Sequence, residues 1–236
     1  MKVLAIIIVL LCLGIVYMAC TESSSVSPSL NPANTVTILG LSTNHLNTYQ
    51  KFDSLITLDP YYQLTLDTSI VTYAVVDIDQ DQSRFDIFVS DEKLARLIAS
   101  PNGVSMTGFY QNIEGHDSLF NFISAPQILP SKLTANDTWD FYVSPLLRNG
   151  QQIITTYLNY GFGFNVTRTY MGKEDIVVPA GAYTAQVIKT EYRVPESDLL
   201  LKTDIEYLVP EIGLVRMYSY GTFGSSHTIM VDTNID

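Results

Sequence analysis

The feature that most constrains the fold is a strict two-residue alternation over residues 151–169. Large apolar side chains such as Tyr160 and Phe162 recur at every second position, and small or polar residues lie between them. Successive side chains of a strand point to opposite faces, so this period predicts one long β-strand and not a helix. Gly161 and Gly163 fall on one face, where missing side chains permit a bend, and we therefore expect a strongly curved sheet.

Further short runs rich in Val, Ile, Thr, Tyr and Phe, separated by Asp, Asn, Gly and Pro, also predict strands. They cover residues 62–66, 70–78, 84–89, 105–110, 138–143, 183–194, 199–209, 213–220 and 228–232. Within one of them Lys202, Asp204 and Glu206 alternate with side chains that suit a core. This alternation indicates antiparallel strands, and we expect the three charged residues on a solvent-exposed face.

One helix is predicted, over residues 91–99. Ser90 can cap its start, and Leu94, Leu97 and Ile98 form an apolar stripe at helical spacing. The expected fold class is therefore mainly β, with a single strongly curved antiparallel sheet and one short helix. The sheet is expected to be a closed barrel or a half-barrel that resembles those of periplasmic lipoprotein carriers.

The first residues predict the destination of the chain. Lys2 is followed by an uncharged apolar run over residues 3–19, which is typical of a secretory signal peptide. The alternative is an uncleaved membrane helix, but this run would span only about 25 Å of a hydrocarbon core that is about 30 Å thick. We therefore interpret residues 1–19 as a signal peptide.

The segment Tyr17-Met18-Ala19-Cys20 resembles the lipobox of bacterial lipoproteins, although Tyr17 stands where that family usually has Leu. The resemblance implies cleavage before Cys20 and acylation of this cysteine with chains such as palmitate, which would anchor the protein to a membrane. The following residues are rich in Ser and Pro, so residues 20–33 are expected to be a lipidated tether to a β-rich domain over residues 34–236. Thr21 replaces the Asp that commonly signals inner-membrane retention, which favours the outer membrane.

Composition excludes several classes of function. The chain carries 24 acidic against 13 basic residues, a net charge of −11, which argues against a nucleic-acid partner. Its two cysteines, Cys12 and Cys20, exclude a disulfide framework. No motif for a cofactor is present, and none is expected.

Aromatic residues supply the candidate ligand-binding site. Tyr157, Tyr160, Phe162 and Phe164 lie on the long alternating strand, where a concave sheet face could bind an apolar molecule or a glycan. The alternative is that aromatic residues simply suit strands and fill the core.

Two weaker patterns have simpler structural explanations. Asp77, Asp79 and Asp81 alternate as in a calcium loop, but Gln82 and Phe88 replace the Gly and Glu that such a loop needs. A hairpin turn is the better interpretation, and no metal site is expected. His116-Asp117-Ser118 contains the residue types of a hydrolase triad, yet adjacent residues cannot converge on one point, so an enzyme is not expected.

Three motifs follow one another in the C-terminal half. They are Asn136-Asp137-Thr138-Trp139, then Val178-Pro179-Ala180-Gly181-Ala182-Tyr183, then Pro210-Glu211-Ile212-Gly213-Leu214-Val215. In this order they resemble the pattern W, V-P-A-G before an aromatic residue, and P-x-[VI]-G-L-V of a family of uncharacterised Gram-negative lipoproteins and exported proteins. The resemblance covers residues 126–220 and implies a domain of unknown function with no known activity. The Pro and Gly residues themselves predict tight turns between paired strands.

Together these features predict an outer-membrane lipoprotein of the bacterial cell envelope, attached to the membrane through its N-terminal lipid. The expected function is a non-enzymatic module that binds an apolar or glycan ligand or interacts with an envelope protein. A structural component of envelope assembly is the alternative, and a hydrolase is a weaker one.

The lipid anchor can be tested directly with the variant Cys20→Ala. We expect this variant to leave the membrane fraction, because the acyl chains and not the acidic protein surface would hold the chain there. Cell fractionation and intact-mass measurement check this. Retention of the variant in membranes would favour an uncleaved helix instead.

Overall fold

The structure is a computed structural model. It describes residues 36–37, 46–57, 63–78, 84–90, 92–113, 116–122, 124–143, 146–148, 151–153, 163–210, 212–222 and 224–233. Within these ranges the regular structure is entirely β, and none of the described residues forms a helix that could cross a membrane. Cys20 and the predicted signal peptide and tether lie outside the described residues.

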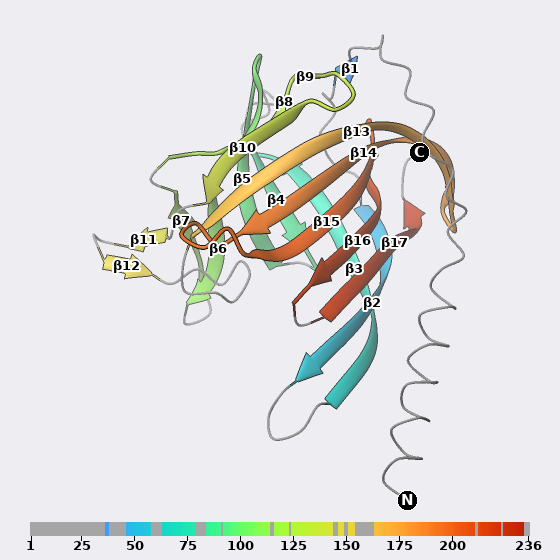
Figure 1. Ribbon diagram of the computed structural model, residues 1–236, viewed down its shortest axis with the longest axis horizontal. Coiled ribbons are helices and arrows are strands. Elements are labelled where there is room, and N and C mark those ends of the chain that lie inside the picture. Colours follow the sequence, from blue (N-terminus) through green and yellow to red (C-terminus); the bar gives the residue numbers. More distant parts are fainter. Residues whose placement is uncertain are drawn as a thin grey trace, which may run out of the picture.

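Seventeen strands are described, and Figure 1 shows their arrangement. In chain order they are β1 (Val36–Thr37), β2 (Leu46–Thr57), β3 (Gln63–Asp77), β4 (Arg84–Val89), β5 (Glu92–Ser100), β6 (Gly103–Ile113), β7 (His116–Asn121), β8 (Gln127–Pro130), β9 (Lys132–Leu133), β10 (Thr138–Val143), β11 (Leu146–Arg148), β12 (Gln151–Ile153), β13 (Phe164–Val178), β14 (Gly181–Arg193), β15 (Leu200–Val209), β16 (Gly213–Gly221) and β17 (Gly224–Thr233).

Thirteen of these strands form one antiparallel sheet in the order β10-β13-β14-β15-β16-β17-β2-β3-β4-β5-β6-β7, with β8 paired to β6. Most neighbours in the sheet are also neighbours in the sequence. The exceptions are β10 with β13, β6 with β8, and β17 with β2. The last of these joins the last described strand to one of the first. This junction divides the sheet into a C-terminal arm (β10 and β13–β17) and an N-terminal arm (β2–β8). In Figure 1, β13–β17 are orange to red and β2–β7 are blue-cyan to green.

The two arms face each other across a shared interior. One core cluster contains Ala95 and Phe109 from the N-terminal arm together with Phe164, Val166 and Tyr192 from the C-terminal arm. Burial alternates along β13, where every second residue is buried from Phe164 to Gly172 and again at Ile176 and Val178, whereas Glu174 is exposed. The two-residue alternation in the sequence therefore corresponds to the alternation of buried and less buried residues along this strand.

The predicted single antiparallel sheet is confirmed, but the predicted curling is not. A barrel requires its end strands to pair, and in the described part of the chain β10 and β7 do not pair. The sheet is open and is neither a closed barrel nor a strongly curled half-barrel. Gly163 precedes the first paired residue of β13, so it lies outside the ladder that it was expected to bend. Irregularity falls instead at β-bulges, as between Tyr170 and Gly172, where Gly172 has a φ of 107°.

The long strand predicted over residues 151–169 is divided. Its beginning is β12, which pairs with β11 in a separate two-stranded sheet, and its end belongs to β13. Residues 154–162 lie outside the described residues.

The helix predicted over residues 91–99 is wrong, because this segment is strand β5. Ser90 adopts a φ of 49° in the turn of the β4–β5 hairpin and does not cap a helix. Ala95 and Leu97 are buried, whereas Leu94 and Ile98 of the supposed stripe are 39% and 36% exposed. Pairing with β4 and β6 on both sides supplies the backbone hydrogen bonds, and this tertiary context overrides a weak helical preference.

Most other strand predictions are confirmed. The strands predicted over residues 84–89 and 138–143 have the bounds of β4 and β10, and those over 183–194, 199–209 and 213–220 match β14, β15 and β16 closely. The two predicted over 62–66 and 70–78 merge into β3. The turns predicted at Pro179 and Pro210 connect β13 to β14 and β15 to β16.

The placement of the core can be tested with a matched pair of isoleucines. Ile188 is fully buried against Leu133 and Tyr170, whereas Ile70 on β3 is 62% exposed. Ile188→Ala should lower the free energy of unfolding by about 2–5 kcal/mol, because it leaves a cavity. Ile70→Ala should change it by less than about 1 kcal/mol. Urea denaturation measures both values, and equal losses would contradict the placement of the core.

Candidate functional site

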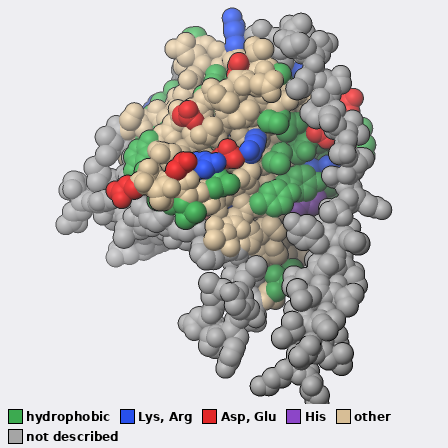
Figure 2. Space-filling view, in the orientation of Figure 1, with side chains coloured by type: hydrophobic (Ala, Val, Ile, Leu, Met, Phe, Trp, Pro, Cys, Tyr) green, Lys and Arg blue, Asp and Glu red, His purple; other side chains and the backbone are tan. Residues whose placement is uncertain are grey.

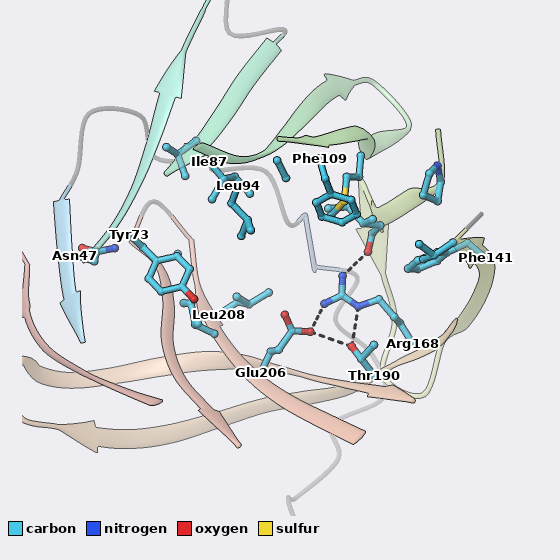
Figure 3. Close-up of a pocket in the computed structure, with 18 of the residues that line it drawn as sticks. Asn47, Tyr73, Ile87, Leu94, Phe109, Phe141, Arg168, Thr190, Glu206 and Leu208 are labelled. Carbon is cyan, nitrogen blue, oxygen red and sulfur yellow. Dashed lines mark hydrogen bonds and ion pairs between the residues drawn. The ribbon is translucent and has the colours of Figure 1, made fainter. Parts of the chain in front are cut away.

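A cavity of about 320 Å³ lies between the two arms. Its wall is mainly apolar, and the N-terminal arm contributes Ile87, Leu94, Met106 and Phe109. Across from them, Phe141 of β10 lines the cavity (Figure 3). Leu94 projects into this space, and it therefore remains partly exposed although it lies on an inner strand.

A buried arginine is the centre of the polar part of the wall. On β13, Arg168 follows Val166 on the inward face, and only 8% of the residue is exposed. Its Nε donates a hydrogen bond to Thr190 Oγ1 at 3.0 Å, and its Nη1 donates to the carbonyl oxygen of Ile128 at 2.5 Å. Its Nη2 forms an ion pair with Glu206. The guanidinium therefore has hydrogen-bond partners on three strands, β14, β8 and β15.

Glu206 lines the cavity, so the prediction that it lies on a solvent-exposed face is wrong. Its Oε2 accepts hydrogen bonds from Arg168 and, at 3.0 Å, from Thr190 Oγ1. Asp204 on the same face is only 4% exposed, because Ser219 and Lys202 contact its carboxylate at 2.6 and 2.9 Å. The charged face of β15 is thus the inner face, where each carboxylate has a cationic partner.

Two tyrosines line the cavity from the N-terminal arm. Tyr49 donates a hydrogen bond from its hydroxyl to the carbonyl oxygen of Leu214 at 2.5 Å. The ring of Tyr73 contacts that of Tyr49 edge to face, with the ring centres 5.1 Å apart. Burial raises the pKa of both phenols, which therefore stay protonated at neutral pH.

Two polar atoms point into the cavity without a partner. In the part of the chain that the structure describes, neither the Tyr73 hydroxyl nor the Oε1 atom of Glu206 has a hydrogen-bond partner. Figure 3 shows both groups directed toward the space between the lining side chains, with Leu208 beside them. The cavity thus offers one phenol donor and one carboxylate acceptor within a largely apolar wall.

Of the four aromatic residues that the sequence placed in a ligand site, Phe164 alone is among the described residues. Phe164 is fully buried in the core cluster that includes Val143 and Val166, and it does not line the cavity. Tyr157, Tyr160 and Phe162 lie outside the described residues. Of the calcium candidates, Asp77 ends β3, and Asp79 and Asp81 lie outside the described residues in the connection of the β3–β4 hairpin. Among the described residues no group of His, Cys, Asp and Glu is placed to hold a metal ion.

Neither His116 of the His116-Asp117-Ser118 segment nor His227 lines the cavity. His116 is exposed at the start of β7, and His227 stacks on Tyr218 with ring centres 4.5 Å apart. Phe52 of the neighbouring strand β2 also stacks on His227, with ring centres 6.0 Å apart. Figure 2 shows hydrophobic side chains gathered around a histidine on the face that it draws. Burial and the nearby Arg216 charge lower the pKa of His227, so its ring is neutral at neutral pH.

Sequence reasoning missed Arg168 and Thr190 and placed Glu206 on the wrong face. A signal for Arg168 was present, because it interrupts an inward row that contains Phe164, Val166 and Tyr170. A charged residue in such a row must be paired when it is buried. The partner lies on another strand, so the sequence spacing alone does not identify it.

Comparisons with known proteins give structural similarity without sequence similarity. No protein-family model matches the chain, and no curated protein matches it at a significant level. A solved structure from Bacteroides fragilis, described as an exported protein with a YmcC-like fold, is 14% identical with a TM-score of 0.35, and the match covers 84% of this chain and 99% of that one.

Two further structures are similar at a comparable level. One, described as a lipoprotein from Parabacteroides distasonis, is 14% identical with a TM-score of 0.37, covering 85% of this chain and all of that one. The other, a β-barrel-like protein of a domain of unknown function from Brucella abortus, is 7% identical with a TM-score of 0.44, covering 81% and 97%. Similarity of this degree does not establish a shared function.

The Arg168 network makes a stability prediction. Arg168→Met should lower the free energy of unfolding by about 3 kcal/mol or more, because it leaves the Glu206 charge without its partner. The double variant Arg168→Met/Glu206→Met should recover most of that loss. The control is the partly exposed pair Lys189–Glu191, whose Nζ and Oε1 atoms are 2.8 Å apart, and Lys189→Met should cost less than about 1 kcal/mol. Equal effects of the two single substitutions in urea denaturation would contradict a structural role for Arg168.

Proposed function

We propose that this chain is a non-enzymatic binding protein of the cell envelope that takes a small, mainly apolar molecule into the cavity between its two arms. The observation that carries the proposal is the cavity itself, about 320 Å³ with a largely apolar wall. Small-molecule sites are typically concave and apolar with a few convergent polar groups, and this cavity fits that description.

The energetics of an apolar cavity support the proposal. A water molecule needs two to four polar partners, so most of this wall offers water a poor site. Each methylene group that moves from water into the cavity contributes about 0.8 kcal/mol. A ligand with an alkyl or ring body therefore gains affinity from the wall without any rearrangement of the sheet.

The envelope part of the proposal rests on the sequence. The basic residue, the apolar run and the Cys20 segment predict export and lipid attachment, so the binding domain would work next to a membrane. A structural role in envelope assembly is the competing proposal. It would be favoured if the chain co-purified with a protein partner and its cavity bound no small molecule.

The binding proposal can be tested by titrating the purified full chain with N-phenyl-1-naphthylamine, a neutral dye that fluoresces in apolar surroundings. We expect saturable binding of one dye molecule per chain. Leu94→Trp should weaken dye binding at least about tenfold, because the larger side chain occupies the cavity. A tenfold change equals about 1.4 kcal/mol, which is less than two buried methylene groups contribute.

The matched control is Leu66→Trp, because Leu66 lies on β3 away from the cavity and is 74% exposed. This variant should bind the dye as the unchanged chain does. Urea denaturation shows that both variants are folded. Dye binding that is insensitive to Leu94→Trp in a folded chain would contradict the proposed site.

A further inference from the structure

The two unpartnered polar atoms of the cavity identify the kind of ligand it takes. Resting on the proposed function, we infer that the ligand is an uncharged amphipathic molecule with a hydroxyl head group, which donates a hydrogen bond to Glu206 Oε1 and accepts one from the Tyr73 hydroxyl. Both groups point into the same cavity, as Figure 3 shows. A hydroxyl suits this pair because it has both a donor and acceptor lone pairs.

The charge state of the wall excludes an anionic head group. Arg168 is the one cation that lines the cavity in the described chain, and each of its three nitrogens already donates a hydrogen bond, to Thr190, Ile128 and Glu206. Its charge is balanced by Glu206. A carboxylate or phosphate would therefore approach the free oxygen of another carboxylate, and such like-charge contacts are unfavourable.

A cationic head group is disfavoured for a related reason. The Arg168–Glu206 pair is neutral as a whole, so an ammonium group in the cavity would be buried without a counterion of its own. An ammonium also has no lone pair, so it cannot accept the hydrogen bond that the Tyr73 hydroxyl donates. An uncharged hydroxyl avoids both penalties.

Tyr73 is suited to the donor role. Burial raises the pKa of its phenol, so it keeps its proton at neutral pH. The edge-to-face contact with Tyr49, at 5.1 Å between ring centres, holds the ring in place. Since the Tyr49 hydroxyl is already bonded to the Leu214 carbonyl, Tyr73 is the phenol that remains available.

The test is competition against bound N-phenyl-1-naphthylamine by three compounds with the same alkyl chain: 1-decanol, decanoate and decylammonium. We expect 1-decanol to displace the dye at concentrations at least about tenfold lower than either charged compound. Tyr73→Phe should weaken 1-decanol about threefold to tenfold, the usual value of one neutral hydrogen bond. Dye affinity is measured for the same variant, and its 1-decanol affinity is calculated against that value.

Glu206→Gln supplies a second readout, because it leaves the Arg168 charge uncompensated. This variant should reverse the preference and favour decanoate over 1-decanol. The control is Tyr142→Phe, because Tyr142 is exposed on β10 and does not line the cavity. Its competition profile should match that of the unchanged chain.

The outcomes separate the two levels of the proposal. The hydroxyl assignment would be overturned, and the binding function left intact, by either of two results. One is equal displacement of the dye by all three compounds, and the other is a folded Tyr73→Phe variant with unchanged 1-decanol affinity. Failure of the chain to bind the dye at all would overturn the proposed function and the assignment together.

Discussion

The structure depends on the burial of one positive charge between its two arms. Arg168 extends from the C-terminal arm and donates to Thr190 and Glu206 on that arm, but it also donates to Ile128 on β8, which is paired to β6 of the other arm. Trp139 adds to the same connection, since its indole donates to the Ile128 carbonyl at 3.3 Å and the Arg168 guanidinium lies over its ring. Backbone pairing joins the arms along β17 and β2, and this cluster joins them across the interior.

The ion pair also explains how a cavity with charged residues can remain largely apolar in character. Glu206 neutralises Arg168. The hydroxyl of Thr190 accepts a hydrogen bond from Arg168 and donates one to Glu206. Both charges are thereby paired within the wall, and among the described residues the unpartnered polar atoms directed into the cavity are one carboxylate oxygen and one phenol hydroxyl. A partly filled polar network is costly in a protein interior unless something completes it.

Sequence periodicity predicted much of the sheet and little of the site. The alternation of apolar and polar residues located β4 and β10 with their bounds, because a strand with one buried face must follow that period. The same alternation does not identify which face is buried, and Glu206 was therefore predicted on the solvent-exposed face. The apolar residues of β5 are compatible with the spacing of a helix as well as with a strand. The segment is a strand because it pairs with β4 and β6. Arg168 was missed because its role depends on hydrogen bonds to Ile128, Thr190 and Glu206, which approach it only in the folded sheet.

The pairing of β17 with β2 has a consequence for the order in which the molecule can assemble. Thr233 hydrogen-bonds Asn47 across 186 residues of sequence, whereas nearly every other strand pairs with a neighbour in the chain. Each arm can therefore form early from local hairpins, but the closure that unites them carries the entropy of a very long loop. Contacts between such distant segments slow folding. A chain that emerges N-terminus first holds β2 with one edge unpaired until residues 224–233 arrive, so the cavity between the arms is among the last parts of the molecule to form.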